Sequence, residues 1–194
     1  MNKIFSLLFF IVTGLHSFGQ NNIGFKFGMN VSNVKNSDGN NFKTLLSFNT
    51  GIVARLKLKD KFMLYTELLL SNKGFHSIII PSGTTATKLA YFSVPVLLEY
   101  EPAKKFYFQL GPEFNFLINA RIKNSRFNES DSESYNKFDL AVAGGVGFNV
   151  FRNFNLETRY SLGLSQIRKN ENIFGSYNTR TFQVNLIYFL KSRK

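Results

Sequence analysis

Apolar and polar side chains alternate along this chain with a period of two, and that alternation limits the fold more than any other feature of the sequence. In the first such run, Ile23, Phe25 and Phe27 alternate with Gly24 and Lys26. A period of two is typical of a strand with one apolar and one polar face, and no segment shows sustained helical periodicity. The pattern recurs in eight runs, at residues 23–31, 48–58, 62–70, 92–100, 106–118, 138–150, 154–164 and 182–190. The alternation therefore predicts an all-β protein.

The connections between these runs alternate between short and long. Short segments follow the second, fourth and sixth runs, at residues 59–61, 101–105 and 152–153. Long polar segments separate the other runs, among them residues 72–88, 120–136 and 166–178. Tight periplasmic turns, long outer loops and an even number of antiparallel strands characterise outer-membrane barrels. We therefore expect an eight-stranded antiparallel up-and-down transmembrane β-barrel with both termini in the periplasm.

The first 19 residues have the features of a secretory signal peptide. Lys3 supplies a positive charge, residues 4–15 are apolar, and Ser17 and Gly19 are small residues where a signal peptidase cleaves. The apolar stretch is shorter than the roughly 20 residues that span a bilayer as a helix. We expect residues 1–19 to be removed as a signal peptide and residues 20–194 to form one outer-membrane β-barrel domain. The expected location is the cell outer membrane.

The alternation alone does not say which face of the barrel points outward. The apolar face carries Phe, Leu, Val or Tyr at most positions, and the chain contains 23 Phe and 8 Tyr. An eight-stranded interior is only just wide enough for its side chains, so this bulky face would overfill it. We therefore expect the apolar face to contact lipid, with aromatic residues near the strand ends at the interfaces: Phe62, Tyr100, Phe106, Phe138, Phe154 and Tyr188. The alternative is a soluble periplasmic ligand carrier of the lipocalin kind, with the two faces inverted.

The polar face carries charges of both signs. We expect them to meet in the lumen, where buried charges need partners. The predicted lumen charge network consists of Lys26, Arg55, Glu67, Glu99, Glu113, Asp139, Glu157 and Arg159. Pro95 lies inside a run, where a proline is unfavourable in a central strand, and it suggests a local bulge.

The formal net charge of +12 indicates an anionic partner. An exported chain rarely meets nucleic acid, so we expect outer-membrane lipid as the partner and no nucleic acid. A protein partner at the extracellular loops or at the periplasmic turns stays open. Basic residues gather at the short-turn end, where we expect a rim facing phospholipid head groups or an acidic periplasmic partner: Lys57, Lys59, Lys61, Lys104, Lys105, Arg152, Lys191, Arg193 and Lys194.

The sequence offers little for catalysis, metal binding or conduction. Cysteine is absent and His76 is the only histidine after the predicted cleavage site, so we expect no metal, no cofactor and no catalytic residues. Ser71, Ser77 and Ser82 lie near His76, but no supporting aspartate accompanies them; a membrane-embedded enzyme is the weaker alternative. An eight-stranded barrel also has no open lumen once its side chains fill it. We expect a non-enzymatic protein with a structural or interaction role through its extracellular loops.

Several short motifs resemble one family. They are Glu67-Leu68-Leu69, Val94-Pro95-Val96-Leu97-Leu98, Leu110-Gly111-Pro112, Gly145-Val146-Gly147, and residues 157–164 with the sequence ETRYSLGL. In their order and spacing they resemble the PorT-like outer-membrane β-barrel domain of Bacteroidetes, which is similar in architecture to the small OmpA and OmpX barrels. The eponymous member takes part in type IX protein secretion. The resemblance therefore implies an outer-membrane barrel and leaves open a role accessory to protein secretion.

Overall fold

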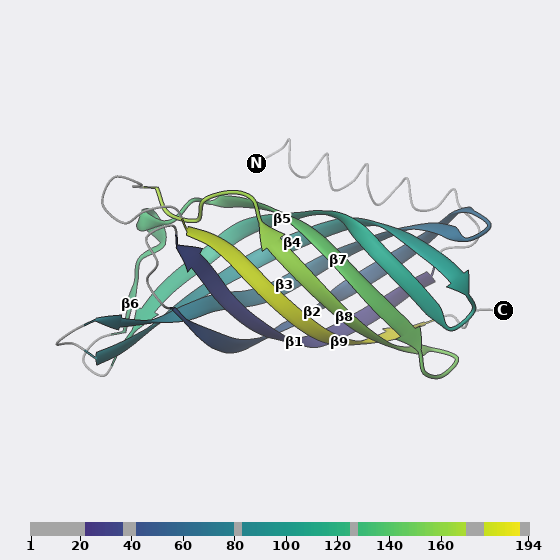
Figure 1. Ribbon diagram of the computed structural model, residues 1–194, viewed down its shortest axis with the longest axis horizontal. Coiled ribbons are helices and arrows are strands. Elements are labelled where there is room, and N and C mark those ends of the chain that lie inside the picture. Colours follow the sequence, from purple (N-terminus) through teal and green to yellow (C-terminus); the bar gives the residue numbers. More distant parts are fainter. Residues whose placement is uncertain (1–21, 37–41, 80–82, 125–127, 170–176, 191–194) are drawn as a thin grey trace.

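The computed structural model describes residues 22–36, 42–79, 83–124, 128–169 and 177–190 (Figure 1). In these residues the chain is almost entirely strand. The elements follow in the order β1 (Asn22–Asn36), β2 (Lys43–Lys59), β3 (Phe62–Ile79), β4 (Gly83–Ala103), β5 (Phe106–Lys123), β6 (Asn128–Ser130), the 3-10 helix η2 (Ser132–Ser134), β7 (Phe138–Asn149), β8 (Phe154–Gly163) and β9 (Tyr177–Phe189). No helix in the described residues is long and apolar enough to cross a membrane.

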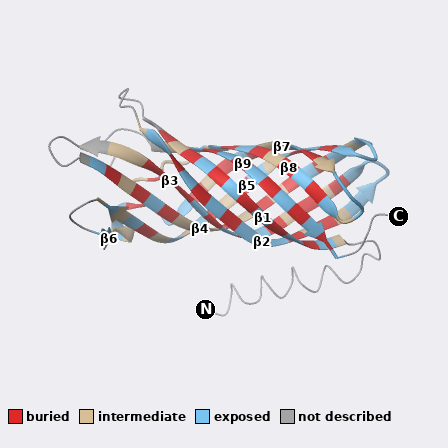
Figure 2. Ribbon diagram, turned by 90° about the horizontal axis from the view of Figure 1, so that it is seen from below, coloured by how far each residue is buried: buried red, intermediate tan, exposed pale blue. Residues whose placement is uncertain are grey.

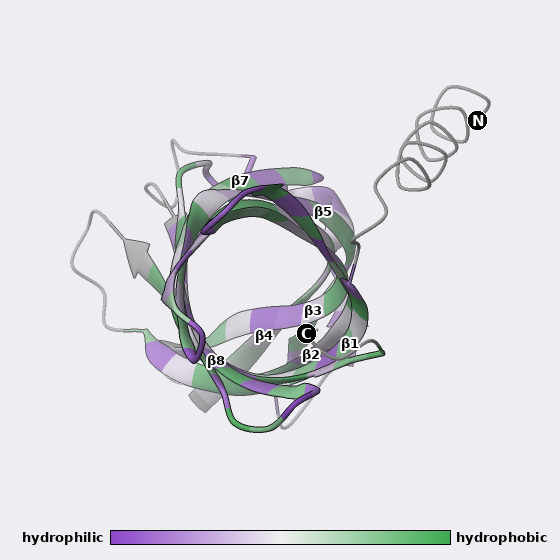
Figure 3. Cartoon of the chain, turned by 90° about the vertical axis from the view of Figure 1, so that its right-hand side faces the viewer, coloured by the Kyte–Doolittle hydropathy of each residue, from purple (hydrophilic) through white to green (hydrophobic). Residues whose placement is uncertain are grey.

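Eight of the strands form a closed ring of antiparallel neighbours. The order around the ring is β1-β2-β3-β4-β5-β7-β8-β9, and β6 pairs with β5 outside it. The ring closes where β9 pairs with β1, from Phe189 opposite Gly24 to Tyr177 opposite Asn36. Viewed along the axis, the strands form one closed ring (Figure 3). The prediction of an eight-stranded antiparallel up-and-down barrel is confirmed.

The two faces of each strand differ sharply in exposure, which gives the ribbon a checkered pattern (Figure 2). Phe25 and Phe27 point outward and are 53% and 57% exposed, whereas Lys26 between them is 1% exposed. The apolar face therefore points outward and the polar face inward. The soluble carrier with an apolar lumen and a polar exterior is wrong. Ring closure also pairs the backbone groups internally, as a lipid surrounding requires.

The aromatic residues expected at the interfaces all lie on the outward face. They form cross-strand ring pairs with centroids 4.9 to 5.5 Å apart: Phe62 with Tyr100, Phe106 with Phe148, Phe154 with Tyr188, and Phe116 with Phe138. The first three pairs lie at the short-turn end and the fourth lies at the other end, so aromatic side chains border the apolar belt on both sides.

The strands β3, β4 and β5 are longer than the sequence pattern predicts. Residues 72–88 were expected to form a loop, but β3 runs to Ile79 and β4 starts at Gly83, with Ile79 opposite Gly83. In the same way, β5 continues to Lys123 and pairs with β6. The outward positions Asn72, Gly74, Ala86, Lys88 and Arg121 are polar or small, so the apolar alternation is lost although the strands continue.

The register is regular at Pro95 and irregular elsewhere. Pro95 lies opposite Glu113, and the next recorded pair, Leu98 opposite Leu110, keeps the same register, so the expected bulge at Pro95 is wrong. The irregularity lies nearer the outer end, where Ala90 pairs with Asn119 but Tyr91 pairs with Leu117. One residue of β5 is left over between these pairs, which is the signature of a β-bulge.

Candidate functional site: the charged lumen

The centre of the lumen holds a cluster of two cations and two carboxylates from three strands. The Nζ of Lys26 on β1 lies 2.7 Å from Glu67 Oε1 on β3 and 2.8 Å from Glu157 Oε1 on β8. Arg159, two residues after Glu157 on β8, donates to both oxygens of Glu67 at 2.7 and 2.9 Å, and its Nη2 lies 2.9 Å from Glu157. All four side chains have 0% exposure. Their positions on the inward alternation of each strand bring them together.

A glutamine joins this central cluster to a second one toward the short-turn end. Gln109 on β5 accepts a hydrogen bond from Arg159 at 3.0 Å and donates one to Glu99 at 3.0 Å. Glu99 also accepts a hydrogen bond from Arg55, whose Nη2 lies 2.9 Å from Oε2, and the Nε of Arg55 lies 2.8 Å from Oε1 in the same ion pair. The Arg55 guanidinium lies over the rings of Tyr107 and Phe189 at 4.9 and 4.5 Å. Hydrogen bonds and aromatic faces thus hold this buried cation in place.

A third pair lies toward the long-loop end. Lys73 on β3 donates to Glu113 at 2.6 Å and to Asn115 at 3.1 Å, both on β5. Between this pair and the centre lies a layer of amides, in which Asn49 donates to Asn30 at 2.6 Å and to Asn185 at 3.0 Å. The polar lumen is therefore continuous along the axis.

Asp139 is the predicted network residue that the structure leaves outside the ion pairs of the described residues. Its side chain is buried, and its Oδ2 accepts a hydrogen bond from Thr179 at 3.2 Å. Its Oδ1 has no hydrogen-bond partner. The other seven predicted residues each form an ion pair with a member of the predicted set or with Lys73.

Lys73 is the charged lumen residue that the sequence pattern missed, because it was assigned to the polar loop at residues 72–88. The signal that could have found Lys73 is the alternation of inward and outward residues along the strand. Glu67, Ser71 and Lys73 share the same alternation, and a strand continuing past residue 72 places Lys73 inside.

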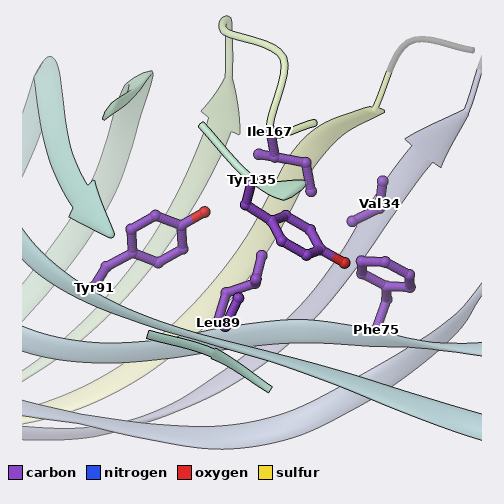
Figure 4. Packing of buried hydrophobic residues seen from close by; sticks show 7 residues of the cluster. Val34, Phe75, Leu89, Tyr91, Tyr135 and Ile167 are labelled. Atoms are coloured by element: carbon purple, nitrogen blue, oxygen red, sulfur yellow. The ribbon is translucent and has the colours of Figure 1, made fainter. Parts of the chain in front are cut away.

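Two apolar clusters lie inside the barrel at either end of the polar zone. The cluster at the short-turn end consists of Val53, Tyr65, Leu97, Ala143, Ile187 and Phe189. The cluster at the loop end includes Tyr135 and Ile167, which are 0% and 1% exposed and come from the connections before β7 and after β8. Figure 4 shows Tyr135 with Ile167 on one side and Leu89 and Phe75 of the barrel wall on the other. Apolar loop residues therefore fill the outer mouth of the lumen. The sequence pattern predicted only polar side chains there.

The residues considered for catalysis are not brought together. Ser71 points into the lumen beside Asn30, with the Asn30 Nδ2 to Ser71 Oγ distance at 3.1 Å, whereas His76 occupies the other alternation of β3, opposite Lys43. Ser77 donates to the carbonyl oxygen of Thr85 at 3.5 Å. Ser82 lies outside the described residues. In the described part of the chain no group of three or more histidines and carboxylates is arranged to hold a metal ion.

The chain matches the family described as "Outer membrane protein beta-barrel domain" over residues 18–169. The match spans most of the chain, from before β1 to after β8. The chain belongs to the outer membrane protein beta-barrel domain family. This protein is therefore an outer-membrane protein embedded in lipid, as the apolar outward face predicts.

Solved structures of other members of this architectural class share the fold. Neisserial surface protein A has 16% identity and a TM-score of 0.59, with 86% of this chain and 96% of that chain covered. Ail, the attachment invasion locus protein of Yersinia pestis, has 18% identity and a TM-score of 0.55, covering 88% and 99%. OprG from Pseudomonas aeruginosa has 16% identity and a TM-score of 0.53, covering 89% and 94%. No curated protein matches the chain by sequence.

Within this outer-membrane family, the short-turn end of the barrel faces the periplasm and the long loops face outward. The rim lysines at residues 57, 59, 61, 104 and 105 and Arg152 are exposed at the short-turn end. Lys191, Arg193 and Lys194 lie outside the described residues. The described rim residues therefore lie at the end of the barrel that carries the short turns, and their contact with head groups or with an acidic partner stays a prediction.

Proposed function

We propose that this protein is a non-conducting, non-enzymatic outer-membrane barrel with a structural and interaction role at its extracellular end. The observation that carries the proposal is the filled lumen. Lys26, Glu67, Glu157 and Arg159 bridge the lumen with fully buried side chains, and Tyr135 and Ile167 cover its outer mouth. A buried, paired layer of this kind leaves no water path at the barrel centre, and the interior becomes a rigid scaffold.

The extracellular ends of β3, β4 and β5 supply the surface for such a role. These strands continue past the apolar belt as a paired sheet, and β6 is added to its edge. Figure 1 shows this sheet and β6 projecting at the end away from the tight turns. Backbone pairing holds the sheet in a defined shape, which lowers the entropy cost of binding.

Conductance across a planar bilayer tests the first half of the proposal. The wild-type protein should produce no steady current. The variant Lys26→Ala/Arg159→Ala should produce leak events if it inserts, because it removes both central cations and leaves two carboxylates free to draw in water. Stable, discrete current steps from the wild-type protein would contradict a filled lumen.

Crosslinking on whole cells tests the second half. A photoreactive amino acid at Thr84, exposed near the tip of the β3–β4 extension, should form crosslinks to cell-surface or external macromolecules. The same group at Leu98, which is 49% exposed in the apolar belt, should react with lipid alone. An identical lipid-only pattern at both positions would show that the extension contacts no macromolecular partner.

We also propose that this protein is a PorT-like barrel with an accessory role in protein secretion. It is supported by the motifs named above and by the exposed basic rim at the periplasmic turns, which an acidic partner would fit. Deleting the gene and comparing the exported proteins tests it. An unchanged set of exported proteins would remove the secretion role and leave the barrel role intact.

A further inference from the structure

The outward face of β4 and β5 carries cations beyond the apolar belt that form no ion pair with another described residue. Lys88 on β4 lies directly opposite Arg121 on β5, and Lys123 lies two residues further along the same face of β5. All three residues are exposed. Like charges placed directly opposite each other on one face of a sheet destabilise the pair. An arrangement that costs stability in the free protein indicates a missing counter-charge.

The chain does not supply that counter-charge from the residues the structure describes. The carboxylates in ion pairs lie inside the lumen. Glu129 on β6 is near in sequence. It lies opposite Ile122, however, so it is on the other face of the sheet from Arg121 and Lys123. No described carboxylate lies within salt-bridge distance of Lys88, Arg121 or Lys123.

The surroundings of Lys88 leave room for a ligand. Its neighbour on β3 is Gly74, and its neighbours on the same face of β4 are Ala86 and Ala90. Ser130 of β6 lies beside Arg121. Because the side chains around Lys88 and Arg121 are small, an anionic group can approach both of these cations.

The height of this patch fits the head-group region of the outer leaflet. Leu70, Phe92 and Phe116 form an apolar row across β3, β4 and β5, and on β5 the exposed Ile118 extends the apolar surface by two residues. Lys88 is four residues beyond Phe92, which is about 13 Å along a strand and about 10 Å along the membrane normal for a typical strand tilt. Polar lipid head groups and their attached sugars occupy this level.

We propose that the face formed by Lys88, Arg121 and Lys123 binds a phosphate group of a glycolipid in the outer leaflet. The guanidinium of Arg121 can donate two parallel hydrogen bonds to phosphate, and Lys88 and Lys123 add point charges on either side. The lipid is confined to the same layer as the patch, so it is present at a high effective concentration. This binding surface is independent of any macromolecular partner at the extracellular sheet.

Binding of bis-phosphorylated lipid A in mixed detergent micelles tests the proposal. The double variant Lys88→Gln/Arg121→Gln should bind at least about tenfold more weakly than the wild type, because two charge-assisted contacts are lost. The matched control Lys43→Gln/Arg180→Gln removes two exposed cations from β2 and β9 at the same end of the barrel and should stay within about twofold of the wild type. Equal binding by the wild type and the first variant would overturn the proposal.

Two further arms identify the ligand. Dephosphorylated lipid A should bind the wild type at least about tenfold more weakly, since phosphate supplies the recognised charge. Millimolar inorganic phosphate should not displace lipid A, because the lipid is concentrated in the micelle. Equal binding of the dephosphorylated lipid would overturn recognition of phosphate, and full displacement by free phosphate would overturn the lipid as the source.

The variant Lys88→Glu separates ligand binding from a structural effect. Its carboxylate faces Arg121 across the strand pair, so the like-charge contact becomes an attractive one. Without lipid A, the folded gel band of this variant should survive to a higher temperature than that of the wild type, while its affinity for lipid A falls. A parallel loss of both properties would indicate that Lys88 acts only in folding and would overturn the proposal.

Discussion

Arg159 contacts two carboxylates and one amide in the lumen, so its removal should have large effects. Arg159→Ala would leave Glu67 and Glu157 with Lys26 as their shared cation in a buried setting. Breaking a buried ion pair from one side costs about 3–5 kcal/mol. We expect Arg159→Ala to lower the urea concentration at which half of the folded gel band is lost, in proportion to this cost. The midpoint of Arg159→Lys should lie between those of Arg159→Ala and the wild type, because lysine keeps the charge but loses the bidentate contact with Glu67. The exposed Arg180→Ala is the control, and an Arg159→Ala midpoint equal to that of the control would contradict the network's stabilising role.

Asp139 should respond in the opposite direction to its neighbour Glu113. Asp139 is buried with one oxygen unsatisfied, so Asp139→Asn removes an uncompensated charge and should stabilise the barrel by on the order of 1 kcal/mol. Glu113→Gln leaves the buried Lys73 without its ion-pair partner and should destabilise the barrel by about 3 kcal/mol. Urea titration of both variants measures the difference. A destabilised Asp139→Asn would mean that a counter-charge for Asp139 exists in the folded barrel.

Within β7, two glycines close together differ in the space beside them. A Cβ on Gly147 would collide with the ring of Tyr107, which lies across the strand pair, whereas a Cβ on Gly144 would lie 3.5 Å from Leu110 Cδ1, an ordinary contact. We expect Gly147→Ala to cost about 1–3 kcal/mol, because Tyr107 is packed beside Arg55 and has little room to shift. Gly144→Ala should leave the urea midpoint nearly unchanged. Equal midpoints for the two variants would contradict the inferred packing of Tyr107 on Gly147.

The strands show how far a sequence pattern can predict this barrel. Inside the lipid, one face must be apolar, so the alternation predicts both the eight strands and their inward residues, including Lys26 and Glu157. Beyond the lipid, both faces can be polar, so the pattern loses contrast and the extensions carrying Lys73 look like loops. Tyr135 and Ile167 could not be assigned to the lumen, because a folded connection, rather than strand parity, places them there. The partners within the lumen depend on the register, which alternation leaves undetermined.

At the scale of the whole molecule, closure of the ring should make the folded protein resistant to detergent. The ring leaves no free edge in the apolar belt, and its centre is bridged by ion pairs. We expect the protein to sediment with outer membranes and to show a heat-dependent shift in mobility on SDS gels. N-terminal sequencing of the same band should begin at Gln20, which follows from the signal peptide predicted at residues 1–19. A first residue of Met1 would contradict that cleavage without changing the barrel assignment.

The two signs of charge occupy different parts of the barrel. The carboxylates in ion pairs point into the lumen, whereas exposed lysines lie at the short-turn rim. Since each basic residue near an anionic membrane contributes about 1 kcal/mol, four rim lysines should favour insertion into anionic bilayers. We expect the variant with glutamine at positions 59, 61, 104 and 105 to fold more slowly into vesicles containing phosphatidylglycerol, and at the wild-type rate into phosphatidylcholine alone. A control that neutralises four exposed cations at the other end, Lys43, Lys137, Lys169 and Arg180, should be affected less, because that end crosses the bilayer during insertion. Equal slowing in both lipids would trace the effect to folding of the turns, and unchanged rates would leave the rim without a role in lipid contact.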